Sequence, residues 1–214
     1  CINVTLAEGL RHRLYETVGK IYIMTIKARY GLSDQLLVGL ERLAKASLKE
    51  PDFEDYFTIH QKNLTAILFS VNCIEAKINE LIAVIEIDAR TVLHSNIKAI
   101  LDIERKVTLK EKFNLICALL NEDLWNSSIE PFQSFEVIQS LRNEIVHYKG
   151  KFDARGKSPN RFKNLLDHLN IKVVDEDLWI QVILESKKLP EWILQKTKQL
   201  DSIIDERILK NLDH

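Results

Sequence analysis

The sequence predicts an all-α protein. Apolar residues recur at helical spacing over most of its 214 residues, and glycine and proline, which interrupt helices, number only six and four. Hydrophobic residues make up 46% and charged residues 29% of the chain, which is typical of a folded globular protein rather than of a disordered or membrane-embedded one. We therefore expect a bundle of helices around a hydrophobic core.

The N-terminal part predicts two helices. Leucine, isoleucine and valine recur at helical spacing through residues 6–30, and a second amphipathic pattern follows from Ser33, which is suited to cap its first turn. Pro51 ends this pattern, because proline disfavours helical geometry at the residue before it. We expect residues 1–60 to form a helical extension that packs on a larger helical bundle formed by residues 61–214.

The middle of the chain predicts the longest helix. It runs from about Gln61 to Ala89, and its apolar residues cover more than one face, as in the most buried helix of a bundle. Residues 91–107 predict a less regular helix or helix pair. Thr108 and Glu111 have the spacing of a capping box at the start of the next helix, and Pro131 suits the first turn of the helix after that.

The sequence changes character after His147. Residues 148–163 are polar and contain two glycines, one proline and a single acid, so we expect an exposed loop. The loop carries six basic residues: Lys149, Lys151, Arg155, Lys157, Arg161 and Lys163. A helix is predicted near residues 175–188, and Pro190 begins a terminal helix. Residues 171–174 are the one place where a short extended piece is expected.

Charge, cysteine and histidine usage exclude several classes of protein. The formal net charge of −1 provides no global basic field, so binding to nucleic acid would need a local patch. The cysteines form no CxxC pair, and we expect Cys73 and Cys117 to be buried thiols of a protein from a reducing compartment. No histidine has a partner at metal-ligand spacing, and no apolar run reaches the ~20 residues of a membrane span. We therefore expect a cytoplasmic protein that uses no metal or cofactor.

The segment LRNEIVHYK places polar groups in a helix that otherwise buries apolar ones. At about 100° per residue, Asn143 and His147 share one side of this helix, whereas Arg142 falls inside the apolar arc. The arc is formed by Phe135, Ile138, Leu141, Ile145 and Val146. Because a buried cation is costly unless it is paired, one interpretation is an ion pair of Arg142 with Glu75 or Glu80. His147 would then be an ordinary surface residue. The other interpretation is a functional site.

The same residues resemble a known motif. Arg142 and Asn143, followed by three residues and His147, resemble the RNxxxH form of the R-x4-6-H motif of HEPN domains. Three further segments resemble parts of HEPN proteins: INELI (78–82), LKEKF (109–113) and LPEWI (189–193). The resemblance covers about residues 61–210.

The HEPN resemblance implies a fold, an assembly and an activity. It implies a helical bundle of four or five helices, commonly a homodimer in which the motif arginine and histidine of both protomers face one shared cleft. Many members are metal-independent endoribonucleases that act as toxins or in phage defence, so an antitoxin or the product of a neighbouring gene is an expected partner. The alternative is a non-catalytic bundle of HEPN type that binds a nucleotide, RNA or a protein.

Each motif residue suits a step of RNA cleavage. The 2′-OH of RNA is the nucleophile, so the protein needs to move protons and to stabilise charge. A histidine such as His147 can accept or donate a proton near neutral pH. Arg142 would hold the scissile phosphate, and Asn143 would orient the phosphate or the imidazole. The expected product is a 2′,3′-cyclic phosphate. Basic residues of the loop would hold the RNA backbone by charge: Lys149, Lys151, Arg155, Lys157 and Arg161.

Overall fold

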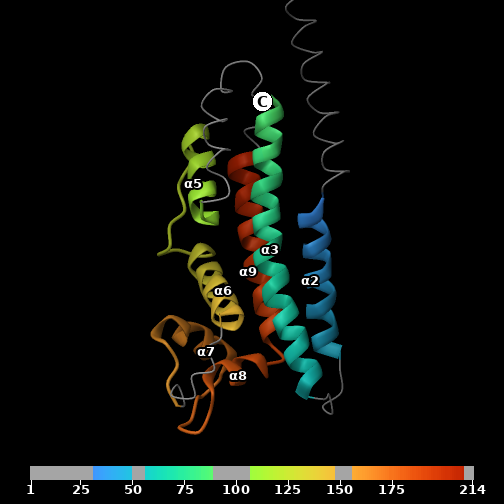
Figure 1. The fold of residues 1–214 in the computed structure, drawn as a ribbon, viewed down its shortest axis with the longest axis vertical. Coiled ribbons are helices and arrows are strands. Elements are labelled where there is room, and N and C mark those ends of the chain that lie inside the picture. Colours follow the sequence, from blue (N-terminus) through green and yellow to red (C-terminus); the bar gives the residue numbers. More distant parts are fainter. Residues whose placement is uncertain (1–30, 50–55, 89–106, 148–155, 210–214) are drawn as a thin grey trace, which may run out of the picture. The chain divides into compact units, whose positions relative to one another are not determined.

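The computed structural model describes residues 31–49, 56–88, 107–147 and 156–209, and within these ranges the longer regular elements are all helices (Figure 1). They are α2 (Leu32–Lys49), α3 (Tyr56–Asp88), α5 (Leu109–Leu120), α6 (Phe132–Val146), α7 (Lys163–Leu169), α8 (Trp179–Leu184) and α9 (Leu189–Ile204), with a 3₁₀ turn η3 (Asn160–Phe162) and a π-helical turn η4 (Asp205–Leu209). The prediction of an all-α protein is confirmed. The helices predicted in residues 6–30 and 91–107 lie outside the described residues.

The chain divides into two compact units. The first comprises Cys1–Leu32, Lys77–Leu124 and Asp205–His214, and the second comprises Ser33–Ala76 and Trp125–Ile204. Helix α2, which belongs to the predicted N-terminal extension, lies almost entirely in the second unit. The extension as a whole stays a prediction, because most of it lies outside the described residues.

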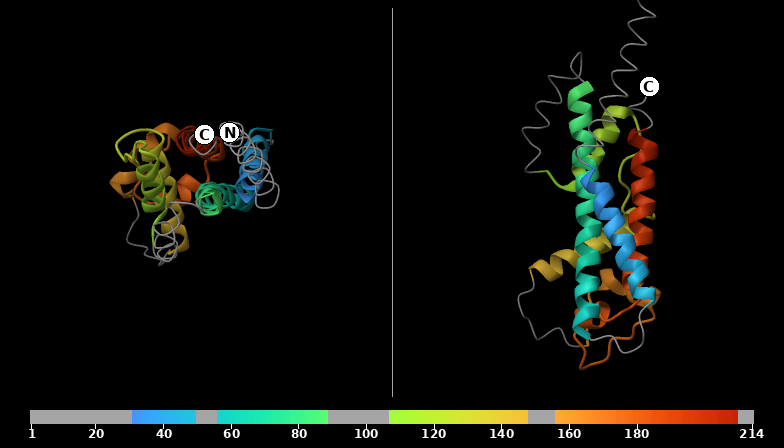
Figure 2. Two further views of the ribbon diagram at one scale, coloured as in Figure 1. Left: turned by 90° about the horizontal axis from the view of Figure 1, so that it is seen from above. Right: turned by 90° about the vertical axis from the view of Figure 1, so that its right-hand side faces the viewer.

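In the second unit, α2 runs antiparallel to α3 at close range (Figure 2). The Sγ atom of Cys73 on α3 donates to the backbone oxygen of Ser33 at the start of α2, at 3.3 Å. Further along, a Cβ atom at Gly39 would lie 2.6 Å from the ring of Phe69, so a residue without a side chain permits this approach. The core between the helices includes Leu40 and Ile67, which are both fully buried.

Helix α9 packs against α3 in the second unit, and two buried hydroxyls meet between them. Ser70 Oγ lies 2.6 Å from Thr197 Oγ1, and the Thr197 hydroxyl donates to the backbone oxygen of Ile193 at 2.7 Å. Because a hydroxyl has one proton, Ser70 is the donor in the contact between the helices. Both hydroxyls are therefore satisfied inside an otherwise apolar layer.

Helix α6 packs against α9 through an apolar face. The fully buried side chains of this face are Phe132, Phe135, Ile138 and Leu141. The predicted arc is too long at its C-terminal end, since Ile145 is only half-buried and Val146 is 52% exposed. Val146 is the last helical residue, and neighbouring elements cover this final turn incompletely.

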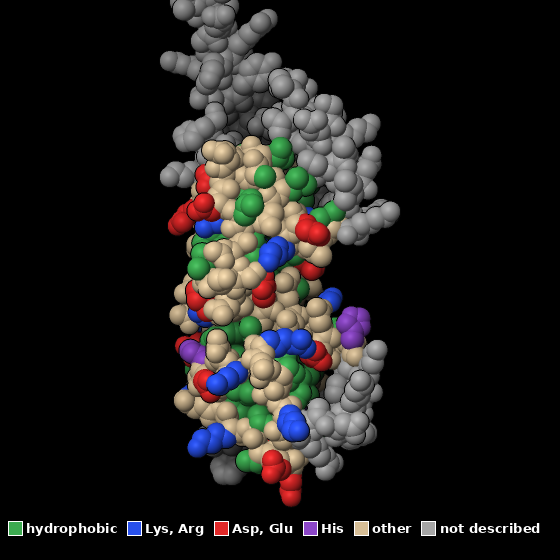
Figure 3. All heavy atoms as spheres, turned by 90° about the vertical axis from the view of Figure 1, so that its left-hand side faces the viewer, with side chains coloured by type: hydrophobic (Ala, Val, Ile, Leu, Met, Phe, Trp, Pro, Cys, Tyr) green, Lys and Arg blue, Asp and Glu red, His purple; other side chains and the backbone are tan. Residues whose placement is uncertain are grey.

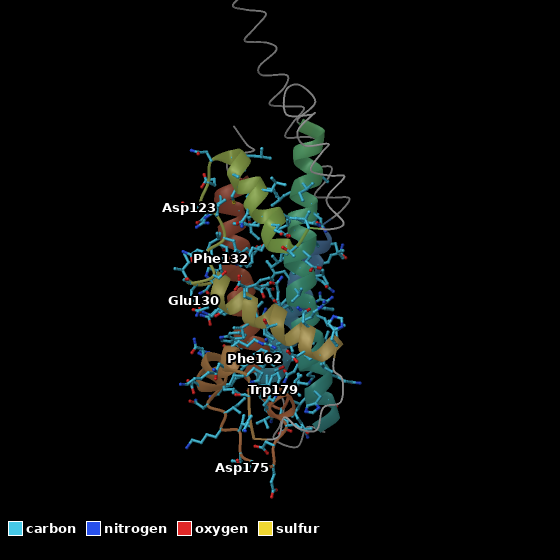
Figure 4. All side chains as sticks on the ribbon, turned by 60° about the vertical axis from the view of Figure 1, so that its left-hand side comes forward. Asp123, Glu130, Phe132, Phe162, Asp175 and Trp179 are labelled. Carbon is cyan, nitrogen blue, oxygen red and sulfur yellow. The ribbon has the colours of Figure 1, made fainter. Side chains whose placement is uncertain are left out.

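The C-terminal part of the second unit holds the shorter helices. The rings of Phe162 and Trp179 stack at 4.7 Å with an interplanar angle of 22°, which joins the start of α7 to the start of α8 (Figure 4). Asn170 ends α7 in the left-handed conformation, and the next amide, that of Ile171, donates to the oxygen of Leu166 at 2.9 Å. Residues 171–174 form neither helix nor strand, and α8 is shorter than predicted.

In the first unit, α5 packs against η4 and begins with the predicted capping box. The amide of Thr108 donates to Glu111 Oε2 at 2.7 Å, and the amide of Glu111 donates to Thr108 Oγ1 at 3.3 Å. The backbone and side-chain hydrogen bonds from Thr108 lower the pKa of the Glu111 carboxyl. Lys77 Nζ lies 2.8 Å from Asp205 Oδ1, an ion pair between α3 and η4.

Within the described ranges, no helix combines the length and the apolar character needed to cross a membrane. Cys73 and Cys117 are both buried free thiols, as predicted. Burial raises the pKa of the Cys117 thiol to about 11. A thiolate is the reactive form of cysteine, so Cys117 is chemically quiet near neutral pH.

We expect iodoacetamide at pH 8 to leave Cys117 unmodified in the folded protein and to alkylate it after unfolding in guanidinium. Mass spectrometry of proteolytic peptides measures both states, and the unfolded sample controls for the reactivity of the peptide itself. Rapid alkylation of Cys117 in folded protein would contradict its burial.

Asn63 provides a second test of the fold. Its buried side-chain amide donates to the backbone oxygens of Leu184 at 2.6 Å and Ser186 at 3.0 Å, which ties α3 to the end of α8. We expect Asn63→Ala to lower the free energy of unfolding by about 2 kcal/mol, because one buried and one part-buried carbonyl group lose their donor. Asn72, exposed on the same helix, is the matched control: Asn72→Ala should change the free energy of unfolding by less than about 0.5 kcal/mol. Urea unfolding followed by circular dichroism measures both, and equal midpoints would refute the role of Asn63.

Candidate functional site

The motif residues lie in the last turn of α6. Asn143 and His147 are both exposed, and the backbone amide of His147 donates to the backbone oxygen of Asn143 at 2.9 Å. His147 is the C-cap of the helix, so its imidazole stands where the regular structure ends. The two side chains therefore lie on one side of a well-defined helix end.

Arg142 has an unusual environment. Its side chain is half-buried, and Nη1 donates to Asn143 Oδ1 at 3.0 Å. The Nε atom is buried and has no hydrogen-bond partner in the described part of the chain. A buried N–H group without an acceptor costs about 1–3 kcal/mol. The guanidinium is thus held by its own motif neighbour at a cost to stability.

The ion pair that would give Arg142 a purely structural role is not observed. Among the described residues, no carboxylate lies within ion-pair distance of its guanidinium, and Glu75 is exposed on α3. The interpretation in which Glu75 or Glu80 neutralises Arg142 is therefore not supported. This leaves an arginine with unused donors in the same helix end as an exposed histidine.

A second arginine is fixed beside the motif. Arg161 Nη2 forms an ion pair with Glu144 Oε1, the residue that follows Asn143, and the Arg161 guanidinium carbon lies 5.1 Å from the centre of the Phe162 ring. The side chain nevertheless remains 51% exposed. Of the predicted RNA-binding cations, Arg161 is the one placed next to the motif by a contact in the described structure.

The other cations predicted to bind RNA have no described contact with the motif. Lys157 is exposed in the stretch between residue 156 and η3. Lys149, Lys151 and Arg155 lie outside the described residues. On the face shown in Figure 3, the described basic and acidic side chains are interspersed. The described surface there is mixed in sign, consistent with the net charge of the chain.

The structure also contains a groove that the sequence did not indicate. Its volume is about 340 Å³, and its walls come from α6, η3, α7 and α9 of the second unit. Its polar lining includes Gln133, Ser140, Arg161, Asn164, His168 and Lys196. These residues come from three separate stretches of sequence, so no local motif could have identified them. Arg161 belongs to both the groove wall and the contact with the motif helix.

One end of the groove is organised by Glu130, at the start of α6 (Figure 4). Its Oε1 atom accepts from the Ser134 hydroxyl at 2.7 Å, and its Oε2 atom lies 3.2 Å from Lys196 Nζ. Nearby, Glu136 Oε1 accepts from Trp125 Nε1 at 2.9 Å and from the Ser127 hydroxyl at 2.6 Å. The acidic groups of the wall are thus held in place by hydrogen bonds.

In the described ranges, no three histidine, cysteine or acidic side chains are arranged to hold a metal ion. Comparisons of the chain with protein-family models, curated proteins and solved structures find no match. The HEPN resemblance therefore rests on the residue pattern, and the chemistry of the site has to be argued from its own side chains.

The position of Arg142 predicts that it is not retained for stability. We expect Arg142→Met, which keeps the side-chain volume without the charge, to leave the free energy of unfolding unchanged or to raise it by up to about 2 kcal/mol, because a buried N–H without an acceptor is removed. Leu141→Ala, at the adjacent and fully buried position, should lower it by about 2–5 kcal/mol. Chemical denaturation measures both variants. A clear loss of stability in Arg142→Met would assign Arg142 to the scaffold.

Proposed function

We propose that this chain is a metal-independent endoribonuclease of HEPN type, in which Arg142, Asn143 and His147 act on the RNA backbone. The observation that carries the proposal is the state of Arg142: a half-buried guanidinium that has no carboxylate partner in the described structure and is held by Asn143. The exposed imidazole of His147 lies one helical turn beyond Asn143. A cation with unused donors and a titratable group in the same helix end suit the binding and cleavage of a phosphodiester.

The proposed reaction follows from these groups. One imidazole takes the proton of the ribose 2′-OH, the 2′-oxygen forms a bond to phosphorus, and the bond from phosphorus to the 5′-oxygen breaks. A general acid gives a proton to the departing 5′-oxygen. Arg142 stabilises the negative charge on the phosphoryl oxygens, and Asn143 orients its guanidinium. The products are a 2′,3′-cyclic phosphate and a 5′-hydroxyl, with no water or metal consumed in this step.

The helix geometry favours a pair of protomers for this reaction. Arg142 and His147 are five residues apart, about 140° around the helix, so they do not point in the same direction from one copy of α6. Two copies of α6 in a homodimer would bring two arginines and two imidazoles to a shared cleft, with one imidazole as base and the other as acid. The proposal therefore includes a homodimer.

Further parts of the proposal follow from the resemblance and from charge. Arg161, together with Lys149, Lys151, Arg155 and Lys157, would hold the RNA backbone, with an affinity that falls as salt rises. A toxin or defence role in the cytoplasm would require an antitoxin or another neutralising protein as partner.

A non-catalytic role is the second candidate, and the groove favours it. Its volume of about 340 Å³ lies in the range of small-ligand sites, and its polar side chains could orient such a ligand. In this case the chain would bind a nucleotide, RNA or a protein without cleaving it, and the motif residues would only contact the bound partner.

We expect the wild-type protein to cleave a labelled mixed RNA pool in EDTA, leaving 2′,3′-cyclic phosphate ends. His147→Ala and Arg142→Met should lower the rate by at least about a hundredfold, as is typical for the loss of a proton-transfer or charge-stabilising group. Gel electrophoresis and mass spectrometry of the ends measure rate and product. Light scattering on the same sample gives the oligomeric state, for which a dimer is expected.

Two controls make this assay decisive. A substrate with 2′-O-methyl groups has no nucleophile and should resist cleavage. Arg42→Ala, at an exposed position on α2, should retain full activity. Equal cleavage by wild type and His147→Ala, purified in parallel, would mean contamination or another site and would overturn the proposal.

A further inference from the structure

The groove in the second unit has features that indicate a specific class of ligand. Several of its polar side chains have no hydrogen-bond partner among the described residues, although they line a concave surface: Gln133, Ser140, Asn164 and His168. The first two come from α6, and the last two come from α7. Polar groups that converge on a pocket without satisfying one another are available to a ligand.

The two carboxamides restrict what this ligand can be. Gln133 and Asn164 each offer a donor and an acceptor side by side, which complements groups with the same alternation, such as the edge of a nucleobase. The imidazole of His168 lies with its centre 6.3 Å from that of the Trp192 ring, so aromatic surface borders the same space. Planar bases pack well against such rings.

The groove also carries positive charge near the motif. One Nη atom of Arg161 is engaged by Glu144, but a guanidinium has five N–H donors, so others remain for a phosphate. At the other end, Lys196 is paired with Glu130, and its side chain is only 16% exposed. Arg161 is therefore the more accessible cation, and it lies at the end of the groove toward Glu144.

We propose that this groove holds one unpaired nucleotide, with the base against Gln133 and Asn164 and the phosphate at Arg161. The lining of α6 extends from Gln133 to Ser140, about 10 Å along the helix, which accommodates a base, a ribose and a phosphate. The volume of about 340 Å³ suits one such unit rather than a folded protein surface. The nucleotide is either free or part of an RNA strand, and the second source rests on the proposed ribonuclease function.

If the nucleotide belongs to RNA, the groove acts as a base-selecting subsite. Ser140 and His147 are seven residues apart on α6, which places them on the same side of the helix about 10 Å apart along its axis. A strand that enters the groove with its phosphate at Arg161 would continue toward Asn143 and His147. The identity of the base in the groove would then determine which phosphodiester reaches the motif.

Direct binding tests the groove independently of cleavage. The folded protein is titrated with the four ribonucleoside 5′-monophosphates, the matching nucleosides, ribose 5-phosphate and inorganic phosphate, followed by ¹H–¹⁵N spectra and calorimetry. We expect at least one monophosphate to bind, and Gln133→Ala and Asn164→Ala each to weaken it about tenfold, the effect of about 1.4 kcal/mol in binding. Gln139→Ala, on α6 outside the groove, should leave binding unchanged.

Three outcomes would overturn the proposal: no binding of any monophosphate, equal binding of ribose 5-phosphate or inorganic phosphate, or equal effects of Gln133→Ala and Gln139→Ala. The orientation has its own test. Arg161→Ala should remove the difference in affinity between nucleotide and nucleoside, whereas Lys196→Ala should retain it. The reverse result would overturn the placement of the phosphate. Circular dichroism confirms that each variant is folded.

Base preference in cleavage separates this proposal from the ribonuclease proposal. Sequencing of cut ends should show a preference in wild type that weakens in Gln133→Ala and Asn164→Ala. Nucleotide binding without cleavage would overturn the ribonuclease and support the groove as a nucleotide site. Cleavage with a base profile that these variants leave unchanged, together with no nucleotide binding, would overturn the groove and support the ribonuclease.

Discussion

Burial of one face of α6 determines where every other group on that helix lies. Phe132, Phe135 and Ile138 are completely removed from water, and each contributes about 1.5–3 kcal/mol relative to exposure. Because a helix is a rigid repeat, fixing this face also fixes the opposite one. The groove wall and the exposed motif residues Asn143 and His147 then become two parts of a single polar face.

Arg142 is the exception on α6, because it lies on the buried side and reaches toward Asn143 on the other. A scaffold free of functional demand would place an apolar residue there and avoid an N–H group without an acceptor. Proteins retain such costs where a reactive or binding group is needed, which is the usual trade between stability and activity. Arg161 and Lys196 differ from Arg142, since each of these two side chains has a carboxylate partner in the described structure.

Local signals were sufficient to predict much of the fold. The capping box at Thr108, the end of α2 before Pro51 and the buried thiols depend on neighbouring residues or on short apolar runs, and the structure shows each of them. The extent of burial at Val146 depends on how far neighbouring elements cover the end of α6, which a periodic pattern does not contain. The groove depends on tertiary packing to an even greater degree. His168 and Lys196 are unremarkable in sequence and become neighbours of Gln133 only when α7 and α9 take their places.

The hydroxyl contact between Ser70 and Thr197 has a consequence for the uniqueness of the packing. Apolar helix faces tolerate sliding, because one leucine contact is much like another. A shift of α9 along α3 by one turn would separate these hydroxyls and leave the Ser70 proton without its acceptor in an apolar layer. The pair therefore selects one axial setting of α9 among several with similar hydrophobic burial. Lys196 precedes Thr197 directly, so the same selection aims its ammonium group into the groove.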